Sequence, residues 1–296
     1  MALAAVLSAM KELILNAPSL PPEQSVREVY IRQTYPKLSD HEAEDLAKID
    51  PSKFKIYTNS IFSSERDLIQ RNFAMTIEYL KMHWTEESSE PFNLFQLVKT
   101  LHKQKPWKSV HTVDLGRNFV DFVGENFKKV QTKAPFLMEI AEMELLLRVV
   151  RRSPDDEVMP KHSLKLEELS SMTVEAILNL HYQIPSCVEY TEFNYSLIAA
   201  RGNFVNEKLP VSETIAPQKI YCALSRNRDA LQRWTEYGKE FYEFLKSQER
   251  QKIFPVSLLA EKFLESADEN KGEEELFKEF IEVVYRSIET GALVIR

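Results

Sequence analysis

The sequence predicts an α+β protein in which an N-terminal all-α helical bundle precedes a small module of sheet and helices. In the first half, apolar residues recur every three or four positions, which is the helical period. After a polar, acidic stretch with two prolines at 153–160, segments rich in Val, Ile, Tyr and Phe alternate with helical ones. We therefore expect a helical domain at 1–152 and an α+β domain, winged-helix-like, at 161–296.

Capping signals mark several helices of the first half. Apolar residues from Leu3 to Ile14 define the first helix, and Ser39 with Glu42 forms a capping box that opens a short acidic one. Asp50 is an N-cap with Pro51 at the first helical position. Further helices are expected through residues 54–68, 77–84, 95–101, 115–123 and 134–151.

The second half alternates between the two patterns. We expect a helix at 174–181, a strand at 187–200, a turn at 201–203, strands at 220–224 and 230–234 around a turn at 226–229, helices at 237–248, 256–266 and 273–289, and a last strand at 292–295. The pairs Phe119/Phe122 and Tyr237/Phe241 have the spacing of core residues.

The composition of the chain excludes several classes of function. The chain has 296 residues, is 44% hydrophobic and carries a net charge of −7, which indicates a globular protein and disfavours a general binder of nucleic acid or acidic membranes. No segment has the length of a membrane span, and the N-terminus lacks the basic region of a signal peptide, so we expect a cytoplasmic protein. Cys187 and Cys222 are then expected as buried thiols in preference to a disulfide.

Motifs for catalysis are missing from the sequence. None of the six histidines lies in an H-x-H, H-E-x-x-H or Cys-x-x-Cys context, and neither a G-x-S-x-G elbow nor a glycine-rich phosphate loop occurs. We therefore expect no catalytic residue, no metal site and no cofactor in this chain, and a stand-alone enzyme has no motif in its favour.

One carboxylate falls on an apolar helical stripe. Glu144 shares a face with the apolar residues of the helix at 134–151, where a carboxylate is costly unless it is paired. It could be a general base or a buried hydrogen-bond hub; we favour the hub, with Arg148, Tyr57 or Asn59 as partner, because no nucleophile or ligand set accompanies it. Gly116 is expected to permit close helix packing.

Three arginines lie on or beside the expected hairpin, namely Arg226, Arg228 and Arg233. They could be a solvated turn or a patch that steers an acidic peptide or a phosphate. An exposed strand edge beside them could bind an extended peptide by strand addition. The expected peptide contacts are the strand residues Ile220, Tyr221, Cys222, Ala223 and Leu224 with the three arginines, or alternatively the strand at 187–200.

Three segments in this order and at this spacing resemble a known family. They are residues 56–62 (IYTNSIF), 113–122 (VDLGRNFVDF) and 134–148 (APFLMEIAEMELLLR). The chain resembles the helical family that carries a DNA-binding name and whose members accompany multinuclear non-heme iron-dependent oxidative enzymes. The partner subunit of methanobactin biosynthesis is the best-known type. The chain departs from the family pattern at Thr58, where Arg is usual.

The resemblance implies a non-catalytic partner subunit. It implies a heterodimer with a TIM-barrel enzyme that holds the iron, and binding of a ribosomally made precursor peptide through its leader. The partner would present a cysteine of that peptide to the iron enzyme for modification. Such a role fits a chain without reactive motifs, since it acts through effective concentration and orientation.

A DNA-binding transcription regulator is the alternative. It would use the C-terminal module as a winged helix. Residues 219–252 contain eight basic and five acidic side chains, a local excess of three positive charges. The net negative charge of the chain and the absence of a helix with a dense basic face in the sequence disfavour DNA binding.

Overall fold

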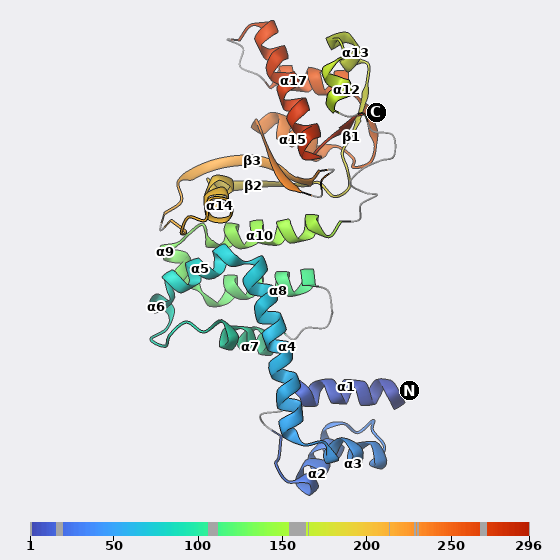
Figure 1. Cartoon of the computed structure of the whole chain (residues 1–296), viewed down its shortest axis with the longest axis vertical. Coiled ribbons are helices and arrows are strands. Elements are labelled where there is room, and N and C mark those ends of the chain that lie inside the picture. Colours follow the sequence, from blue (N-terminus) through green and yellow to red (C-terminus); the bar gives the residue numbers. More distant parts are fainter. Residues whose placement is uncertain are drawn as a thin grey trace. The chain divides into compact units, whose positions relative to one another are not determined.

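The computed structural model describes residues 2–15, 20–105, 112–153, 164, 166–212, 214–227, 229, 231–266 and 271–295. Helices and two small antiparallel sheets make up this part of the chain, in agreement with the expected α+β class (Figure 1). It divides into two compact units, residues 1–71 with 93–106, and residues 72–92 with 107–296. Residues 107–152 are thus grouped with the C-terminal half. Independent folding of 1–152 and 161–296 stays a prediction.

The first unit is helical. Its elements are α1 (Ala2–Leu15), α2 (Gln24–Thr34), α3 (Asp40–Lys48), α4 (Pro51–Asn72) and α7 (Leu94–Gln104). Leu13, Ile31, Leu46 and Phe54 belong to one buried apolar cluster. The buried Arg27 ties this cluster together, because its guanidinium donates to the main-chain carbonyls of residues 21, 22 and 47.

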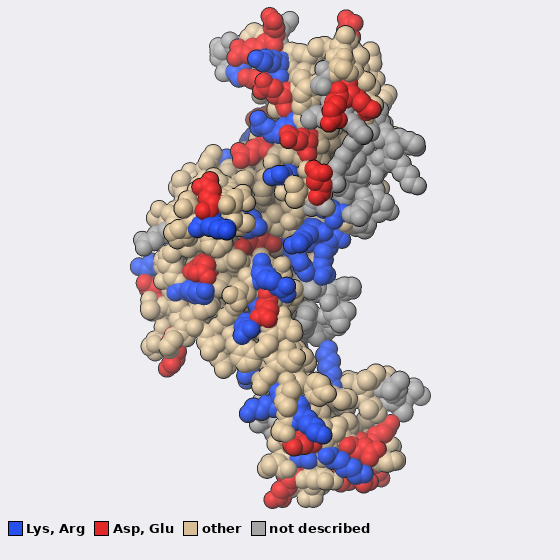
Figure 2. Space-filling view, in the orientation of Figure 1, with Lys and Arg blue, Asp and Glu red and all other residues tan. Residues whose placement is uncertain are grey.

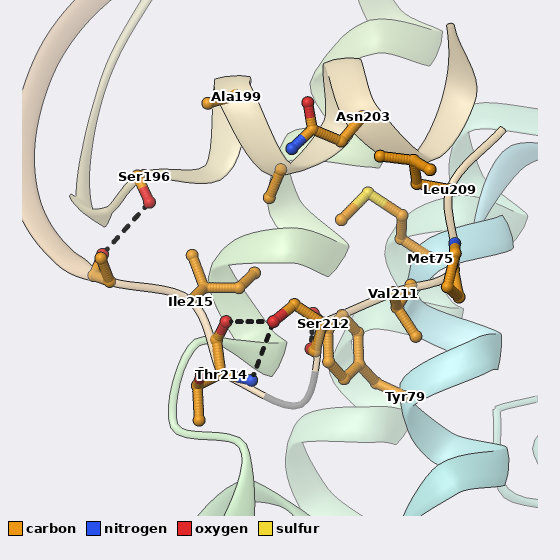
Figure 3. Close-up of a pocket in the computed structure, with 13 residues that line it drawn as sticks. Met75, Tyr79, Ser196, Ala199, Asn203, Leu209, Val211, Ser212, Thr214 and Ile215 are labelled. Atoms are coloured by element: carbon orange, nitrogen blue, oxygen red, sulfur yellow. Dashed lines mark hydrogen bonds between the residues drawn. The ribbon is translucent and has the colours of Figure 1, made fainter. Parts of the chain in front are cut away.

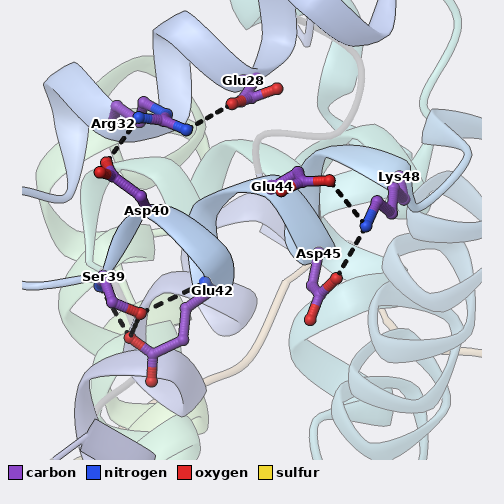
Figure 4. A network of polar contacts seen from close by, with 8 residues as sticks. All are labelled: Glu28, Arg32, Ser39, Asp40, Glu42, Glu44, Asp45 and Lys48. Atoms are coloured by element: carbon purple, nitrogen blue, oxygen red, sulfur yellow. Dashed lines mark hydrogen bonds and ion pairs between the residues drawn. The ribbon is translucent and has the colours of Figure 1, made fainter.

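The start signals of α3 and α4 are confirmed. The Ser39 hydroxyl accepts from the Glu42 N–H, and the Glu42 carboxylate accepts from the Ser39 N–H at 2.8 Å (Figure 4). The Asp50 carboxylate accepts from the Ser52 N–H at 2.8 Å, directly before Pro51. Each cap satisfies donors that the first helical turn leaves without a helical partner.

The second unit contains the remaining helices and both sheets. The helices are α5 (Ala74–Met82), α6 (Trp84–Glu87), α8 (Thr112–Asn126), α9 (Lys128–Lys133), α10 (Leu137–Arg151), α12 (Leu166–Ser170), α13 (Val174–Leu178), α14 (Leu197–Val205), α15 (Lys239–Ser247), α16 (Val256–Glu265) and α17 (Glu273–Thr290). The strands are β1 (His181–Gln183), β2 (Glu189–Tyr195), β3 (Pro217–Arg226), β4 (Gln232–Tyr237), β5 (Ile253–Pro255) and β6 (Val294–Ile295). The strand orders are β5-β1-β6 and β2-β3-β4.

The β2-β3-β4 sheet is covered on both faces. On one face Leu224 and Trp234 cluster with Leu147 and Val150 of α10, which lies along the sheet (Figure 1). On the other face the hydroxyl of Thr235 bonds with that of Thr290, at the end of α17. Because successive strand residues point to opposite faces, odd-numbered residues of β3 and β4 face α17 and even-numbered ones face α10.

The expected bounds of several elements are wrong. The strand expected at 187–200 ends at Tyr195, and the turn expected at 201–203 lies inside α14. A register shift between Phe193 and Tyr195 ends regular pairing there, and the alanines that follow favour a helix. Tyr237 ends β4 instead of starting a helix, and His181 starts β1 instead of ending one. The aromatic pairs expected in the core are buried, as expected.

Candidate functional site

The expected peptide-binding strand lies in the middle of its sheet. β3 pairs with β2 along one side and, from Tyr221 to Arg226, with β4 along the other, so this part of its main chain cannot accept a further strand. Ile220, Cys222, Ala223 and Leu224 are buried, and Tyr221 is half-buried against the Tyr242 ring. The assignment of these five residues as peptide contacts is therefore wrong. A hydrophobic strand pattern identifies a strand but not its position in the sheet.

The register shows which main-chain groups point away from the sheet. The N–H of Asn194 in β2 donates to the Glu139 carboxylate of α10 at 2.8 Å, and so points away from β3. In an antiparallel ladder alternate residues share this direction. The residues of β2 whose main-chain groups point outward are therefore Tyr190, Glu192 and Asn194. The same alternation, followed through the β3–β4 register, makes the main-chain groups of Gln232, Trp234 and Glu236 point outward in β4.

The two outer edges differ in what they contact. At β2, Glu139 occupies the Asn194 N–H, and Arg250 lies 3.5 Å from Glu189 at the other end. At β4, the described residues place no strand against the outer side of the main chain. β4 is thus the more accessible edge in the part of the chain that the structure describes.

The arginines of the hairpin do not form one surface patch. Arg226 is buried, and its guanidinium donates to the Arg151 carbonyl at 3.0 Å. Arg233 is exposed on β4, and Arg228 lies outside the described residues. The expectation of an exposed patch is therefore wrong for Arg226, because its even-numbered position on β3 points it at the end of α10.

Exposed positive charge lies instead at the end of α10. Arg151 and Arg152 are exposed, and the side chain of Gln232 donates to the carbonyl of Leu147 in the same helix. The end of α10 and the start of β4 are therefore neighbours. Figure 2 shows Lys and Arg gathered near the end of α10, whereas elsewhere on that face both signs are mixed. The run Arg148–Arg152 could have signalled this patch in the sequence.

A polar cavity of about 650 Å³ lies beside the start of β4. Its lining includes Arg233 together with the carboxylates of Glu167, Asp229 and Glu289. The side of the hairpin that faces α17 is therefore more acidic than basic. An anionic ligand would find a favourable potential on the α10 side of β4 and not on this one.

Glu144 is buried and hydrogen-bonded, as expected, but its hydrogen-bond partners differ from the three expected ones. The carboxylate is 2% exposed and accepts from the main-chain N–H groups of Met75 and Thr76 at 3.0 and 3.1 Å, and from the Thr76 hydroxyl at 2.8 Å. Arg201 of α14 lies 3.7 Å away. Burial raises the pKa of Glu144, and the Thr76 and Met75 hydrogen bonds and the Arg201 charge oppose this shift.

Tyr57 and Asn59 are exposed, so their assignment to the buried hub is wrong. The buried stripe of α4 runs through Phe54, Thr58 and Phe62, and residues 57 and 59 lie on either side of it. The Thr58 hydroxyl donates to the main-chain carbonyl of Phe54 at 2.8 Å, so this buried hydroxyl is satisfied within its own helix and does not form a hub.

The packing role of Gly116 is confirmed. A Cβ atom at this position would lie 2.8 Å from Leu145 Cδ1 and 3.3 Å from Phe73 Cζ. Such a contact is closer than real Cβ atoms make, so a larger residue here would have to displace the Leu145 side chain where α8 packs on α10.

A second cavity, of about 480 Å³, lies between α5, α14 and residues 209–212 and 214–216 (Figure 3). Its lining includes Met75 of α5, whose main-chain N–H binds Glu144, and Ala200, which precedes Arg201. The Glu144 cluster thus supports two walls of the cavity. None of its thirteen described lining residues is charged.

The remaining chemistry is sparse within the described ranges. No group of three or more His, Cys, Asp or Glu side chains could hold a metal ion there. Cys187 and Cys222 are buried thiols without a disulfide, as expected, and burial raises the pKa of Cys222 to about 12. Among the described helices, none is both long and apolar enough to cross a bilayer.

Comparison with known proteins adds no relative: no family model matches the chain, and no curated protein matches it.

Proposed function

We propose that this chain is a non-catalytic partner subunit that binds a ribosomally made precursor peptide and presents its cysteine to a separate iron-dependent oxidative enzyme. The observation that carries the peptide-binding step is the outer edge of β4, against which the described residues place no strand. Such an edge offers a row of main-chain donors and acceptors that an extended peptide can pair with.

Charge supports an acidic leader peptide at this edge. Arg151 and Arg152 are exposed at the end of α10, next to Gln232 at the start of β4, on the α10 side of the strand. In a chain of net charge −7 this local positive charge would steer an acidic segment. Its affinity for the peptide should fall as salt is added, because exposed charges are screened.

The resemblance supplies the rest of the proposal. The iron enzyme would be a TIM-barrel chain bound as a heterodimer, and the modification would take place in that partner. This chain would contribute orientation and effective concentration, which need a shaped surface and not a reactive side chain.

The test begins with a peptide probe. A random twelve-residue phage-displayed library is selected on the full-length chain, and a selected peptide is labelled with fluorescein for anisotropy measurements. Glu236 and Glu192 are exposed, and their N–H groups point outward on β4 and β2. Because these N–H groups point away from β3, a proline at either position removes no hydrogen bond of the sheet, and edge strands tolerate proline at such positions.

We expect Glu236→Pro to weaken binding by about tenfold or more, because the added strand loses a main-chain donor and meets the proline ring. Glu236→Ala is the matched control and should change affinity less than about twofold. Glu192→Pro, with Glu192→Ala as its own control, should bind like wild type. A loss confined to Glu192→Pro would assign the peptide to β2 and contradict the β4 site.

Charge reversal is the independent arm. Arg151→Glu with Arg152→Glu should weaken binding of an acidic peptide and flatten its salt dependence. Unchanged binding by both proline variants, or no selectable peptide, would overturn strand addition. Tight binding of duplex DNA would favour the winged-helix regulator instead.

A further inference from the structure

The cavity between α5, α14 and the described residues 209–212 and 214–216 has the features of a preformed binding site. Its volume of about 480 Å³ lies in the range typical of small-ligand pockets. Small side chains, Ala199, Ala200 and Ala216, line it where larger ones would fill it. Leu209, at its mouth, is 47% exposed, so the cavity is open to solvent.

Hydrogen bonds fix the cavity wall at both ends. The Tyr79 hydroxyl of α5 donates to the Ser212 carbonyl at 2.6 Å, and the Ser212 hydroxyl donates to the Thr214 carbonyl at 2.7 Å (Figure 3). At the other end the N–H of Ser196 donates to the Ala216 carbonyl at 3.0 Å. A ligand would therefore not have to order these hydrogen-bonded residues of the wall, which lowers the entropic cost of binding.

The lining defines the chemistry of the occupant. Met75, Val211 and Ile215 provide apolar surface, and no described lining residue carries a charge that would favour an ionic ligand. Asn203 of α14 also lines the cavity and is exposed, so its side-chain amide is accessible to a ligand (Figure 3). An amide side chain both donates and accepts, so it complements a peptide group.

We propose that this cavity binds a branched aliphatic side chain of a peptide, with the Asn203 amide pairing with the peptide group of that residue. The site does not depend on strand addition at β4, because its residues come from α5, α14 and the segment before β3. It would add an anchor for a single residue, which main-chain pairing along a strand edge does not provide.

Binding can be measured on the full-length chain with capped leucine (N-acetyl-L-leucine methylamide) as the probe. The chain is labelled with ¹³C at its methionine methyls, and the Met75 signal is followed by NMR, because Met75 lines the cavity. The apparent Kd should be about millimolar, as the low ligand efficiency of small flexible ligands implies. Capped aspartate should give no shift, since the described lining residues include no cation that would pair with its carboxylate.

Three variants assign the shift to the cavity. Ala199→Leu fills the space at an exposed helix position and should abolish the Met75 response. Asn203→Ala should weaken binding by about three- to tenfold, the effect of one lost hydrogen bond. Asn206→Ala, at the exposed residue after the same helix and outside the lining, is the matched control and should bind like wild type.

A separate measurement tests whether the cavity accepts the side chain of a peptide. A capped pentapeptide with two glycines on each side of the leucine should bind at least as tightly as capped leucine. No Met75 shift with wild type, or an equal shift in Ala199→Leu, would overturn the site. Exclusion of the pentapeptide would overturn the peptide occupant. If Glu236→Pro binds both probes as wild type does, the cavity acts separately from the β4 edge. If that variant loses binding of both probes, the cavity and the β4 edge are not independent.

Discussion

Replacing Glu144 should expose how strongly a buried carboxylate supports the second unit. Glu144→Ala leaves three donors without their acceptor, namely the N–H groups of Met75 and Thr76 and the Thr76 hydroxyl. Each buried donor without a partner costs about 1–3 kcal/mol. Arg201 adds little, because its side chain is 27% exposed and can turn to solvent.

The lower end of that range, applied to three donors, predicts a loss of about 3 kcal/mol. This corresponds to a fall of roughly 6–12 °C in the melting temperature of a unit of this size. Glu144→Gln keeps an acceptor for part of the cluster, so its loss should be smaller, about 1–2 kcal/mol. Thermal and urea unfolding measure both, and hydrogen exchange of the Met75 and Thr76 amides locates the effect.

Glu142→Ala is the matched control on the same helix. Its carboxylate is 41% exposed and pairs with Arg117 at the surface, an interaction worth about 0–1 kcal/mol. Equal melting temperatures for Glu144→Ala and Glu142→Ala would refute the argument. So would unchanged exchange of the two amides in Glu144→Ala.

The raised pKa of Glu144 adds a pH dependence. The folded state holds the Glu144 proton more tightly than the unfolded chain, so this group favours folding below its ordinary value of 4.5. That contribution is lost as pH rises from 4.5 through the raised folded pKa. The stability of wild type relative to Glu144→Gln should therefore fall as pH increases across this window, and a difference that grows with pH would contradict the direction of the shift.

Three further outcomes follow from packing and burial. Gly116→Ala should cost about 1–3 kcal/mol in a chemical unfolding experiment, because the added carbon lies 2.8 Å from a leucine methyl. Gly124→Ala meets only the flexible end of a methionine and should be neutral or gain up to about 1 kcal/mol of helix propensity; equal losses would disprove the packing argument. Cys187 and Cys222 should resist a thiol reagent at neutral pH until denaturant is added, since both are buried; rapid labelling of the native chain would count against this burial. Arg27→Met should destabilise the first unit by about 2–3 kcal/mol, because buried carbonyls lose their donor, and an unchanged urea midpoint would speak against that role.

Local signals in the sequence were sufficient for most helices. The capping box at Ser39, the N-cap at Asp50 and the helix of residues 273–289 depend on side chains a few positions apart, which a sequence shows directly. The burial of Glu144 also follows from a local pattern, because a helical stripe defines one face.

Features that depend on distant partners were not predictable in this way. The hub partners of Glu144 come from residues 75, 76 and 201, and no local rule connects these to residue 144. The strands β1 and β5 have three residues each and are defined by pairing with one another. The central position of β3 likewise follows from the β2–β3 and β3–β4 pairings and not from its composition.

The two proposed binding features share one physical origin. The residues expected to contact a peptide became core, because β3 is paired on both sides and its sheet is covered by α10 and α17. In both proposals, recognition uses groups at the surface of the described structure, namely the outward main chain of β4 and the amide of Asn203. Both lie on rigid supports, since β4 is paired with β3 and the cavity walls of α5 and α14 meet at Glu144. Under these proposals, the buried Glu144 carboxylate would support binding by holding the elements that carry the cavity.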